Sequence, residues 1–184
     1  MAKSAQAVRS EPLAGRVTGA AGVQLTPAAP AARISLRADP SDARALSRAL
    51  GLDLPLNPKT SSSNRQGRLA AWLGPDEWLV IDEAGDPAAD LGKVKVLHSA
   101  VDISHRNTAI LVSGKGARAT LEAGCPQNLS DMAFPVGAAS RTVLGKIEVV
   151  IIRSGEADFR VECWRSFSTY VFDLLSESAR DCLA

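Results

Sequence analysis

The side chains that could act as nucleophiles are three cysteines, Cys125, Cys163 and Cys182, and the histidines that could serve them as a base are His98 and His105. A cysteine attacks as its thiolate, which a nearby histidine or another cation stabilises. Cys125 follows the end of a predicted helix, where the helix dipole destabilises a negative charge. We therefore interpret the thiols as small buried side chains and not as nucleophiles.

Glycines beside lysines could bind phosphate. Gly114, Lys115 and Gly116 lie between a predicted strand and a predicted helix, which resembles a phosphate-binding turn. Ala119 stands where the dinucleotide fingerprint has its third glycine, a replacement it sometimes allows, but no parallel return strand follows. Gly145 and the lysine after it lack the other residues of a Walker loop. We interpret these glycines as residues of tight turns.

Metal binding and acid–base chemistry have little support. The histidines and cysteines include no pair at the spacing of metal ligands. Asp76 and Glu77 stand in a predicted turn, where solvated carboxylates are usual. The sequence therefore predicts a chain with no catalytic, cofactor-binding or metal-binding residues and with no complete active site of its own.

Three pairs of residues have types that are common at protein interfaces. Two tryptophans flank a predicted hairpin turn, a histidine and an arginine lie in a polar cluster between strands, and a tryptophan and an arginine precede the last helix. Tryptophan and arginine are enriched at binding hot spots. Equally, the tryptophans could fill the core and the polar residues could pair locally. The candidate interface residues are Trp72, Trp78, His105, Arg106, Trp164 and Arg165.

The composition excludes several partners. The 184 residues carry 21 basic and 20 acidic side chains, and the net charge is +1. No basic cluster is present, so we expect neither nucleic acid nor an anionic membrane as partner. No stretch approaches the roughly 20 apolar residues of a membrane span, and residues 1–16 lack the apolar core of a secretory signal. Unpaired cysteines fit a reducing compartment, so we expect a cytoplasmic protein.

The first half of the chain alternates between short strands and helices. The hydrophobic pattern predicts a helix from Asp39 to Leu50, ended by Gly51, and a loop over residues 52–66. Asp86 and the proline after it open a short helix that runs to Leu91. The predicted strands are residues 33–37, 68–73, 78–82 and 93–97.

The second half has a related order. A short helix is predicted over residues 116–123, and a last helix begins near Ser166. The predicted strands are residues 108–112, 140–144, 146–153 and 158–163. The apolar stripe predicted for the last helix consists of Phe167, Tyr170, Val171, Leu174 and Leu175. This order predicts an α+β fold of two fused ferredoxin-like halves, whose antiparallel sheets are covered by helices.

The domain organisation follows from composition. Residues 1–32 are rich in alanine, glycine and proline and show no clear period, so they are predicted to form an N-terminal arm. The arm is either flexible or bound to a partner, and the residues leave both interpretations open. Residues 33–184 are predicted to form the α+β domain, with subdomains of about 33–100 and 101–184.

Several segments together resemble one family. Residues 71–79 (AWLGPDEWL), 101–106 (VDISHR), 111–114 (LVSG), 125–129 (CPQNL), 134–137 (FPVG) and 165–167 (RSF) carry the resemblance. They are similar to the γ subunit of bacterial heterotetrameric sarcosine oxidase. The resemblance covers residues 72–175, and the combination is more specific than any one segment.

The resemblance implies a fold akin to the folate-binding aminomethyltransferase domains of the glycine cleavage system, which share residues 102–105 (DISH). It also implies α, β and δ subunits as partners in an enzyme that oxidatively demethylates sarcosine to glycine. It implies no cofactor on this chain: FAD, FMN, NAD and tetrahydrofolate belong to large subunits, and zinc to the small δ subunit. The function it implies is that of a non-catalytic structural subunit.

Two alternatives remain open. The first is a free-standing folate-binding protein of the aminomethyltransferase-like group, based on residues 102–105. The chain is about half as long as such proteins usually are and lacks a Lys-Gly-Cys segment of one related family. The second is an interaction module of another complex.

Overall fold

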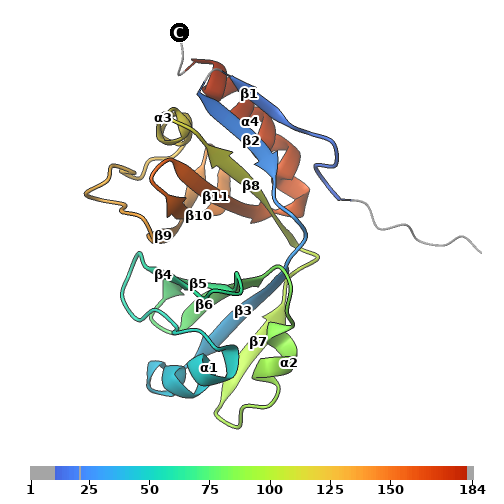
Figure 1. Ribbon diagram of the computed structural model, residues 1–184, viewed down its shortest axis with the longest axis vertical. Coiled ribbons are helices and arrows are strands. Elements are labelled where there is room, and N and C mark those ends of the chain that lie inside the picture. Colours follow the sequence, from blue (N-terminus) through green and yellow to red (C-terminus); the bar gives the residue numbers. More distant parts are fainter. Residues whose placement is uncertain (1–10, 21, 182–184) are drawn as a thin grey trace, which may run out of the picture.

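The computed structural model describes residues 11–20 and 22–181. Two antiparallel sheets lie one above the other, and helices cover the outer face of each sheet (Figure 1). We call these sheets the lower sheet and the upper sheet, after their places in Figure 1. None of the helices within the described residues is long and apolar enough to cross a membrane.

The lower sheet has the strand order of a ferredoxin-like half. Its strands run in the order β4-β5-β6-β3-β7, and each pairs antiparallel with its neighbour. The strands are β3 (Ala32–Ala38), β4 (Ser61–Ser63), β5 (Leu69–Gly74), β6 (Glu77–Asp82) and β7 (His98–Asp102). The helices are η1 (Pro40–Asp42), α1 (Ala43–Leu50) and α2 (Pro87–Leu91). Gly51 ends α1 at a φ of 61°, a left-handed conformation that favours glycine.

The upper sheet and its helices contain the first and the last elements of the described chain. Its strands run in the order β1-β2-β8-β11-β10-β9. They are β1 (Thr18–Ala20), β2 (Val23–Pro27), β8 (Asn107–Ser113), β9 (Ala139–Leu144), β10 (Ile147–Gly155) and β11 (Asp158–Trp164). The helices are α3 (Ala117–Glu122), η2 (Arg165–Phe167) and α4 (Ser168–Asp181). The chain therefore forms two strands of the upper sheet first, then the whole lower sheet, and then the rest of the upper sheet.

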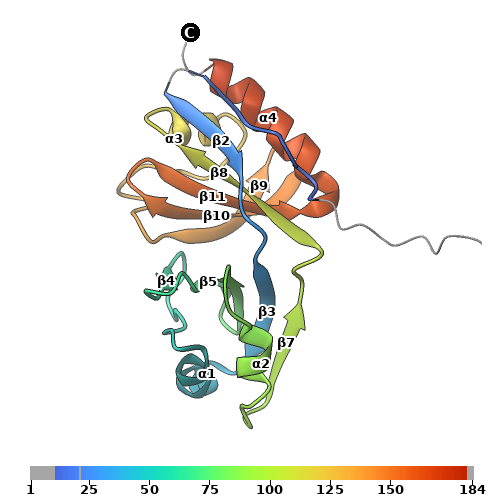
Figure 2. The ribbon, with the colours of Figure 1, turned by 45° about the vertical axis from the view of Figure 1, so that its right-hand side comes forward.

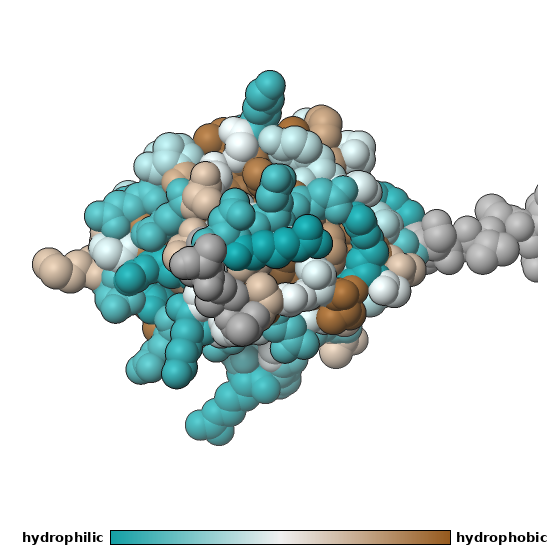
Figure 3. Space-filling model, turned by 90° about the horizontal axis from the view of Figure 1, so that it is seen from above, coloured by the Kyte–Doolittle hydropathy of each residue, from teal (hydrophilic) through white to brown (hydrophobic). Residues whose placement is uncertain are grey.

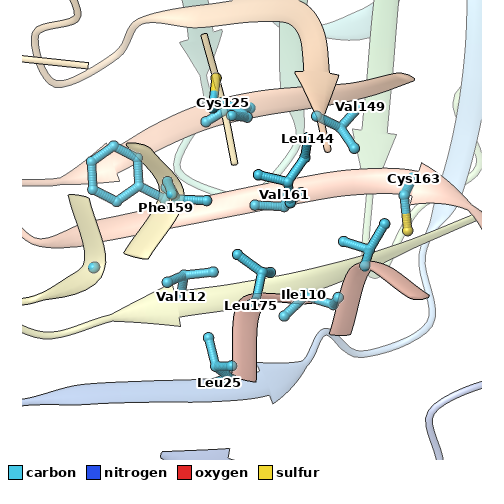
Figure 4. Close-up of a cluster of buried hydrophobic side chains, with 14 of the residues drawn as sticks. Leu25, Ile110, Val112, Cys125, Leu144, Val149, Phe159, Val161, Cys163 and Leu175 are labelled. Atoms are coloured by element: carbon cyan, nitrogen blue, oxygen red, sulfur yellow. The ribbon is translucent and has the colours of Figure 1, made fainter. Parts of the chain in front are cut away.

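Apolar side chains fill three separate layers. The largest lies between the upper sheet and its helices, where Leu25, Phe159 and Leu175 are almost completely buried (Figure 4). A second lies between the lower sheet and α1 and α2. A third, thinner layer lies between the two sheets and includes Leu79 and Ile152. Successive residues of a strand point to opposite faces of its sheet, so the strands of each sheet contribute side chains both to the layer under the helices and to the layer between the sheets.

A buried ion network joins the two sheets. Arg33 in β3 donates from Nε to Glu162 Oε2 in β11 at 2.7 Å, and both side chains are almost inaccessible to solvent. Arg160 donates to the other oxygen of Glu162 at 2.8 Å and also pairs with Glu83 at 3.1 Å. Such a pair is costly to break, because the remaining charge stays buried without its partner.

The α+β prediction is confirmed, with two antiparallel sheets and their helices as expected. Part of the predicted N-terminal arm belongs to the upper sheet: β1 and β2 extend that sheet, and Leu13, Val23 and Leu25 are buried. Isolated apolar residues in a segment rich in glycine and proline gave no strand period. Residues 1–10 lie outside the described part of the chain.

Three local predictions differ from the structure. The strand predicted over residues 93–97 lies instead at β7; Val94 and Val96 alternate because they pack on the lower core from a loop. The stripe of α4 is shifted: Val171, Phe172 and Leu175 are buried, whereas Phe167 and Tyr170 are exposed. The predicted loop over residues 52–66 also contains the short strand β4.

Candidate partner interface

The polar cluster predicted between strands is the turn from β7 to β8. Asp102 accepts hydrogen bonds from the hydroxyl and the backbone N–H of Ser104, and these bonds lower the pKa of Asp102. Ser104 Oγ in turn accepts from Arg33 N at 2.9 Å, and Ile103 packs between the sheets. The first residues of the cluster therefore fasten this turn to β3. His105 and Arg106, which follow, are exposed.

A second loop, between β11 and α4, lies against this turn. Arg165 N donates to Arg106 O at 2.7 Å, which ties the two loops together. The Arg106 guanidinium lies 5.1 Å from the centre of the Trp164 ring, and Trp164 stacks on Phe167 with ring centroids 6.1 Å apart. Ser168 Oγ donates to Arg165 O at 2.8 Å and fixes the start of α4.

We call Arg106, Trp164, Arg165 and Phe167 the aromatic–arginine patch. Trp164 is 41% exposed and Phe167 is 39% exposed, although both are large apolar side chains. A guanidinium over an indole ring is a favourable contact, although at an exposed site it contributes only about 0.5–1 kcal/mol. The patch thus has the residue types of a binding hot spot. By contrast, Figure 3 shows the upper end of the molecule as largely hydrophilic, with scattered hydrophobic atoms.

The two tryptophans of the hairpin are directly opposite each other in β5 and β6. Trp78 is completely buried in the lower core, and its Nε1 donates to Pro55 O at 2.7 Å. This burial removes Trp78 from the predicted interface residues. Trp72 is half-buried, and its Nε1 has no hydrogen-bond partner among the described residues. The structure therefore brings together His105, Arg106, Trp164 and Arg165 but places Trp72 and Trp78 in the other half.

Neither described cysteine has the surroundings of a nucleophile. Cys163 is buried in the upper core, and burial, together with the charge of Glu162, raises the pKa of its thiol to about 12. Cys125 is also buried, and its Sγ lies 3.8 Å from Thr142 Oγ1. Cys182 lies outside the described residues. Among the described residues, no group of three histidines, cysteines or carboxylates could hold a metal ion.

The glycines beside Lys115 have a packing role. Gly114 has a φ of 108°, and a Cβ atom there would lie 2.2 Å from the carbonyl oxygen of Gly22. The bare backbone of Gly114 therefore lets the segment before β2 approach β8. A hollow of about 700 Å³ lies beside these residues, but Arg153, its buried cation, donates to Phe134 O, Gly155 O and Glu156 O. The Arg153 guanidinium therefore bonds carbonyl groups of neighbouring loops and is not an open anion-binding group in the hollow.

The space between the two sheets is nearly filled. A cavity of about 60 Å³ remains there, lined by Leu79, Ile103 and Glu162 and bordered by Arg106 and Trp164. Ligand sites for small molecules commonly measure about 300–1,000 Å³. The cavity borders the aromatic–arginine patch but is too small to hold a cofactor in this conformation.

Comparisons with known proteins agree over most of the chain. The model of the "Sarcosine oxidase, gamma subunit family" matches residues 35–181. The sarcosine oxidase subunit gamma of Corynebacterium sp. (strain P-1) is 32% identical over 173 residues, which are 88% of this chain and 84% of that protein. The subunit gamma of Arthrobacter sp. is 34% identical over 149 residues, which are 77% of this chain and 72% of that protein.

Solved structures show the same relationship. A chain of the heterotetrameric sarcosine oxidase from Corynebacterium sp. U-96 has a TM-score of 0.85 at 27% identity, over 96% of this chain and 97% of that chain. The glycine cleavage system aminomethyltransferase T from Bartonella henselae has a TM-score of 0.60 at 18% identity, over 87% of this chain and 49% of that chain. The second likeness shows a common fold alone.

Proposed function

This chain belongs to the sarcosine oxidase gamma subunit family, and from that membership we propose that it is a non-catalytic structural subunit of a heterotetrameric sarcosine oxidase. The observation that carries the proposal is the match over nearly the whole chain to one chain of a solved heterotetrameric sarcosine oxidase. The partners are the α, β and δ subunits, and the assembly is cytoplasmic. The complex oxidatively demethylates sarcosine to glycine.

The residues of this chain support a structural role. The thiol of Cys163 is buried and held protonated, and the glycines near Lys115 serve packing. The aromatic–arginine patch presents aromatic and cationic side chains to solvent. We propose that this patch, with His105 beside it, contacts a partner subunit and that FAD, FMN, NAD, tetrahydrofolate and zinc are held by the other subunits.

The alternative of a free-standing folate-binding protein has less support. It rests on the fold shared with an aminomethyltransferase and on residues 102–105. In this chain Asp102 and Ser104 bond each other and β3, and the cavity between the sheets measures about 60 Å³. Calorimetry with tetrahydrofolate tests this alternative directly, and we expect no binding heat.

Co-expression of all four subunits, with and without this chain, tests the proposed function. We expect the tetramer to be lost or its sarcosine turnover to fall strongly when the chain is omitted. Normal assembly and turnover of the other three subunits would show that the structural role is wrong.

A paired variant tests the patch within the complex. Replacing both Arg106 and Trp164 by alanine should reduce co-purification of the chain with its partners. Hot-spot truncations commonly cost about 2 kcal/mol or more in binding. Arg44→Ala, at an exposed arginine in α1, is the matched control and should assemble normally.

A further inference from the structure

Strand β7 forms one border of the lower sheet (Figure 2). Within the described part of the chain it pairs with β3 alone. Natural edge strands are commonly protected by proline, by lysine, by a bulge or by shortness. The sequence of β7 is His-Ser-Ala-Val-Asp, which has neither proline nor lysine, and its register to β3 is regular over all five residues.

The register decides which backbone groups of β7 are open. Ile103 N donates to Arg33 O at 2.9 Å, and in an antiparallel pair the bonded residues alternate. Ser99 and Val101 therefore bond to β3, whereas the N–H and C=O groups of His98, Ala100 and Asp102 point away from the sheet. An extended backbone is the natural complement of such a row of donors and acceptors.

Two apolar side chains near this edge are exposed to solvent and would be buried by a bound partner. Leu97, in the bend just before the strand, is 90% exposed, and Val101, within the strand, is 53% exposed. The strand also leads directly into the turn that carries His105 and Arg106. The open edge and the aromatic–arginine patch are therefore adjacent parts of one surface.

The charged residues near the two ends of β7 indicate which kind of segment could bind along this edge. The loop before β7 carries the exposed Lys95, whereas Lys93 in the same loop pairs with Asp90 at 3.4 Å, and the turn after β7 carries His105 and Arg106. Antiparallel pairing with a second copy of the chain, centred on β7, would bring Lys95 of one copy near Arg106 of the other, which is unfavourable. An extended segment with acidic residues near its ends is complementary to both ends of the strand.

We propose that β7 receives an extended segment of a partner subunit as an added antiparallel or parallel strand, with acidic residues flanking apolar ones. This proposal rests on the proposed function, because it presumes a complex with other subunits. It adds the mode of binding: backbone hydrogen bonds along β7 provide affinity, and Leu97 and Val101 provide an apolar contact.

Proline substitution on the open edge tests the proposal. Ala100→Pro removes an outward N–H and leaves the bonds to β3 in place. In co-expressed complexes we expect about tenfold or greater loss of co-purification with the partners, since one hydrogen bond is lost and the proline ring obstructs the added strand. If Ala100→Pro assembles like the unmodified chain, the proposal is overturned.

The matched control is a proline on the border strand of the other sheet. Ala139 N donates to Lys59 O, outside the upper sheet, so the N–H of Ala139 points away from β10. Val143 lies four residues further along β9, and its N–H therefore also points away from β10. Val143→Pro should assemble normally. If it impairs assembly as strongly as Ala100→Pro does, the effect is not specific to β7 and the proposal fails.

Hydrogen exchange of the unmodified complex tests whether a partner strand binds along β7, even if the Ala100→Pro variant fails to fold. We expect slow exchange of the amides of Ala100 and Asp102 in the tetramer, although neither faces β3; fast exchange overturns the proposal. A mass measurement that finds paired copies of this chain, joined without a partner strand, also overturns it. Failure of the unmodified chain to co-purify at all would instead refute the proposed function.

Discussion

Arg33, Arg68 and Arg153 are buried, and each one bonds acceptors that belong to separate segments. Arg33 joins the two sheets through Glu162, and Arg153 holds the carbonyl groups of Phe134 and Glu156. Arg68 bonds Asp82 at 2.6 Å, Asp90 at 2.9 Å and the carbonyl oxygen of Leu50 at 2.6 Å. Arginine suits this work because its planar fork donates in several directions and keeps its charge when buried.

Removing Glu162 should destabilise the chain more than removing an exposed acid. Glu162→Ala leaves the buried Arg33 without its charged partner and removes one of the two partners of Arg160, so we expect a loss of about 3–5 kcal/mol in the free energy of unfolding. Asp76→Ala breaks the exposed pair with Arg37 and should have a much smaller effect, because solvent screens an exposed ion pair. Urea denaturation measures both, and equal effects would contradict the role given to the network.

Acid should weaken the fold through Asp82. Burial alone would raise the pKa of Asp82, but the N–H groups of Ala84 and Gly85 and the Arg68 guanidinium outweigh it and lower the pKa. A lowered pKa contributes stability that is present above the unfolded value of about 4 and is lost as pH falls through the folded pKa. Asp82→Asn should have a lower Tm at neutral pH and a smaller drop in acid, measured by thermal melts from pH 7 to pH 3.

At the scale of elements, sequence patterns located most strands because their apolar residues alternate locally. The predicted strand over residues 158–163 lies within β11, and its alternating residues Phe159, Val161 and Cys163 are buried. The other face of this strand carries the charged residues Arg160 and Glu162. A single strand pattern cannot show that a second sheet covers that face.

The candidate site was predictable in part for a related reason. The residue types of Arg106 and Trp164 indicated an interface, but their contact joins loops far apart in the chain. Trp78 has the same residue type as Trp164, and only the packing of the lower core distinguishes a buried indole from an exposed one. The open edge of β7 also depends on tertiary structure, because sheet order decides which strand lies at a border.

Strand β2 provides a test of the N-terminal segment. Leu25 is fully buried against β8 and α4, whereas Gln24, next to it, is exposed. Leu25→Ala should lower the free energy of unfolding by about 2–5 kcal/mol, and Gln24→Ala should have little effect. Chemical denaturation of both variants measures this, and a neutral Leu25→Ala would mean that β2 is an appendage to the fold.

At the scale of the whole molecule, the proposed contacts lie along one continuous surface. The open edge of β7 leads through the turn of residues 103–106 to the aromatic–arginine patch at the start of α4. One partner subunit that covers this surface would contact both sheets at once. Binding would then also stabilise the association of the two halves.

Assembly should therefore protect Trp164 from solvent. In the free chain, acrylamide should quench part of the tryptophan fluorescence, because Trp164 is exposed while Trp78 is buried. Trp164→Phe should remove most of that quenchable signal. We expect the difference between the two proteins to shrink in the assembled complex; an equally accessible Trp164 there would place the interface elsewhere.

The order of strands in the upper sheet also affects how the chain folds during synthesis. The lower sheet, from β3 to β7, is continuous in sequence and can form once residue 102 has left the ribosome. Val23 and Leu25 are synthesised earlier, yet their neighbours in β8 and α4 appear much later. During synthesis these apolar residues therefore remain exposed to solvent until β8 and α4 have been made. Protection of this short early segment, by a chaperone or by slow collapse onto the nascent lower half, becomes a requirement of this topology.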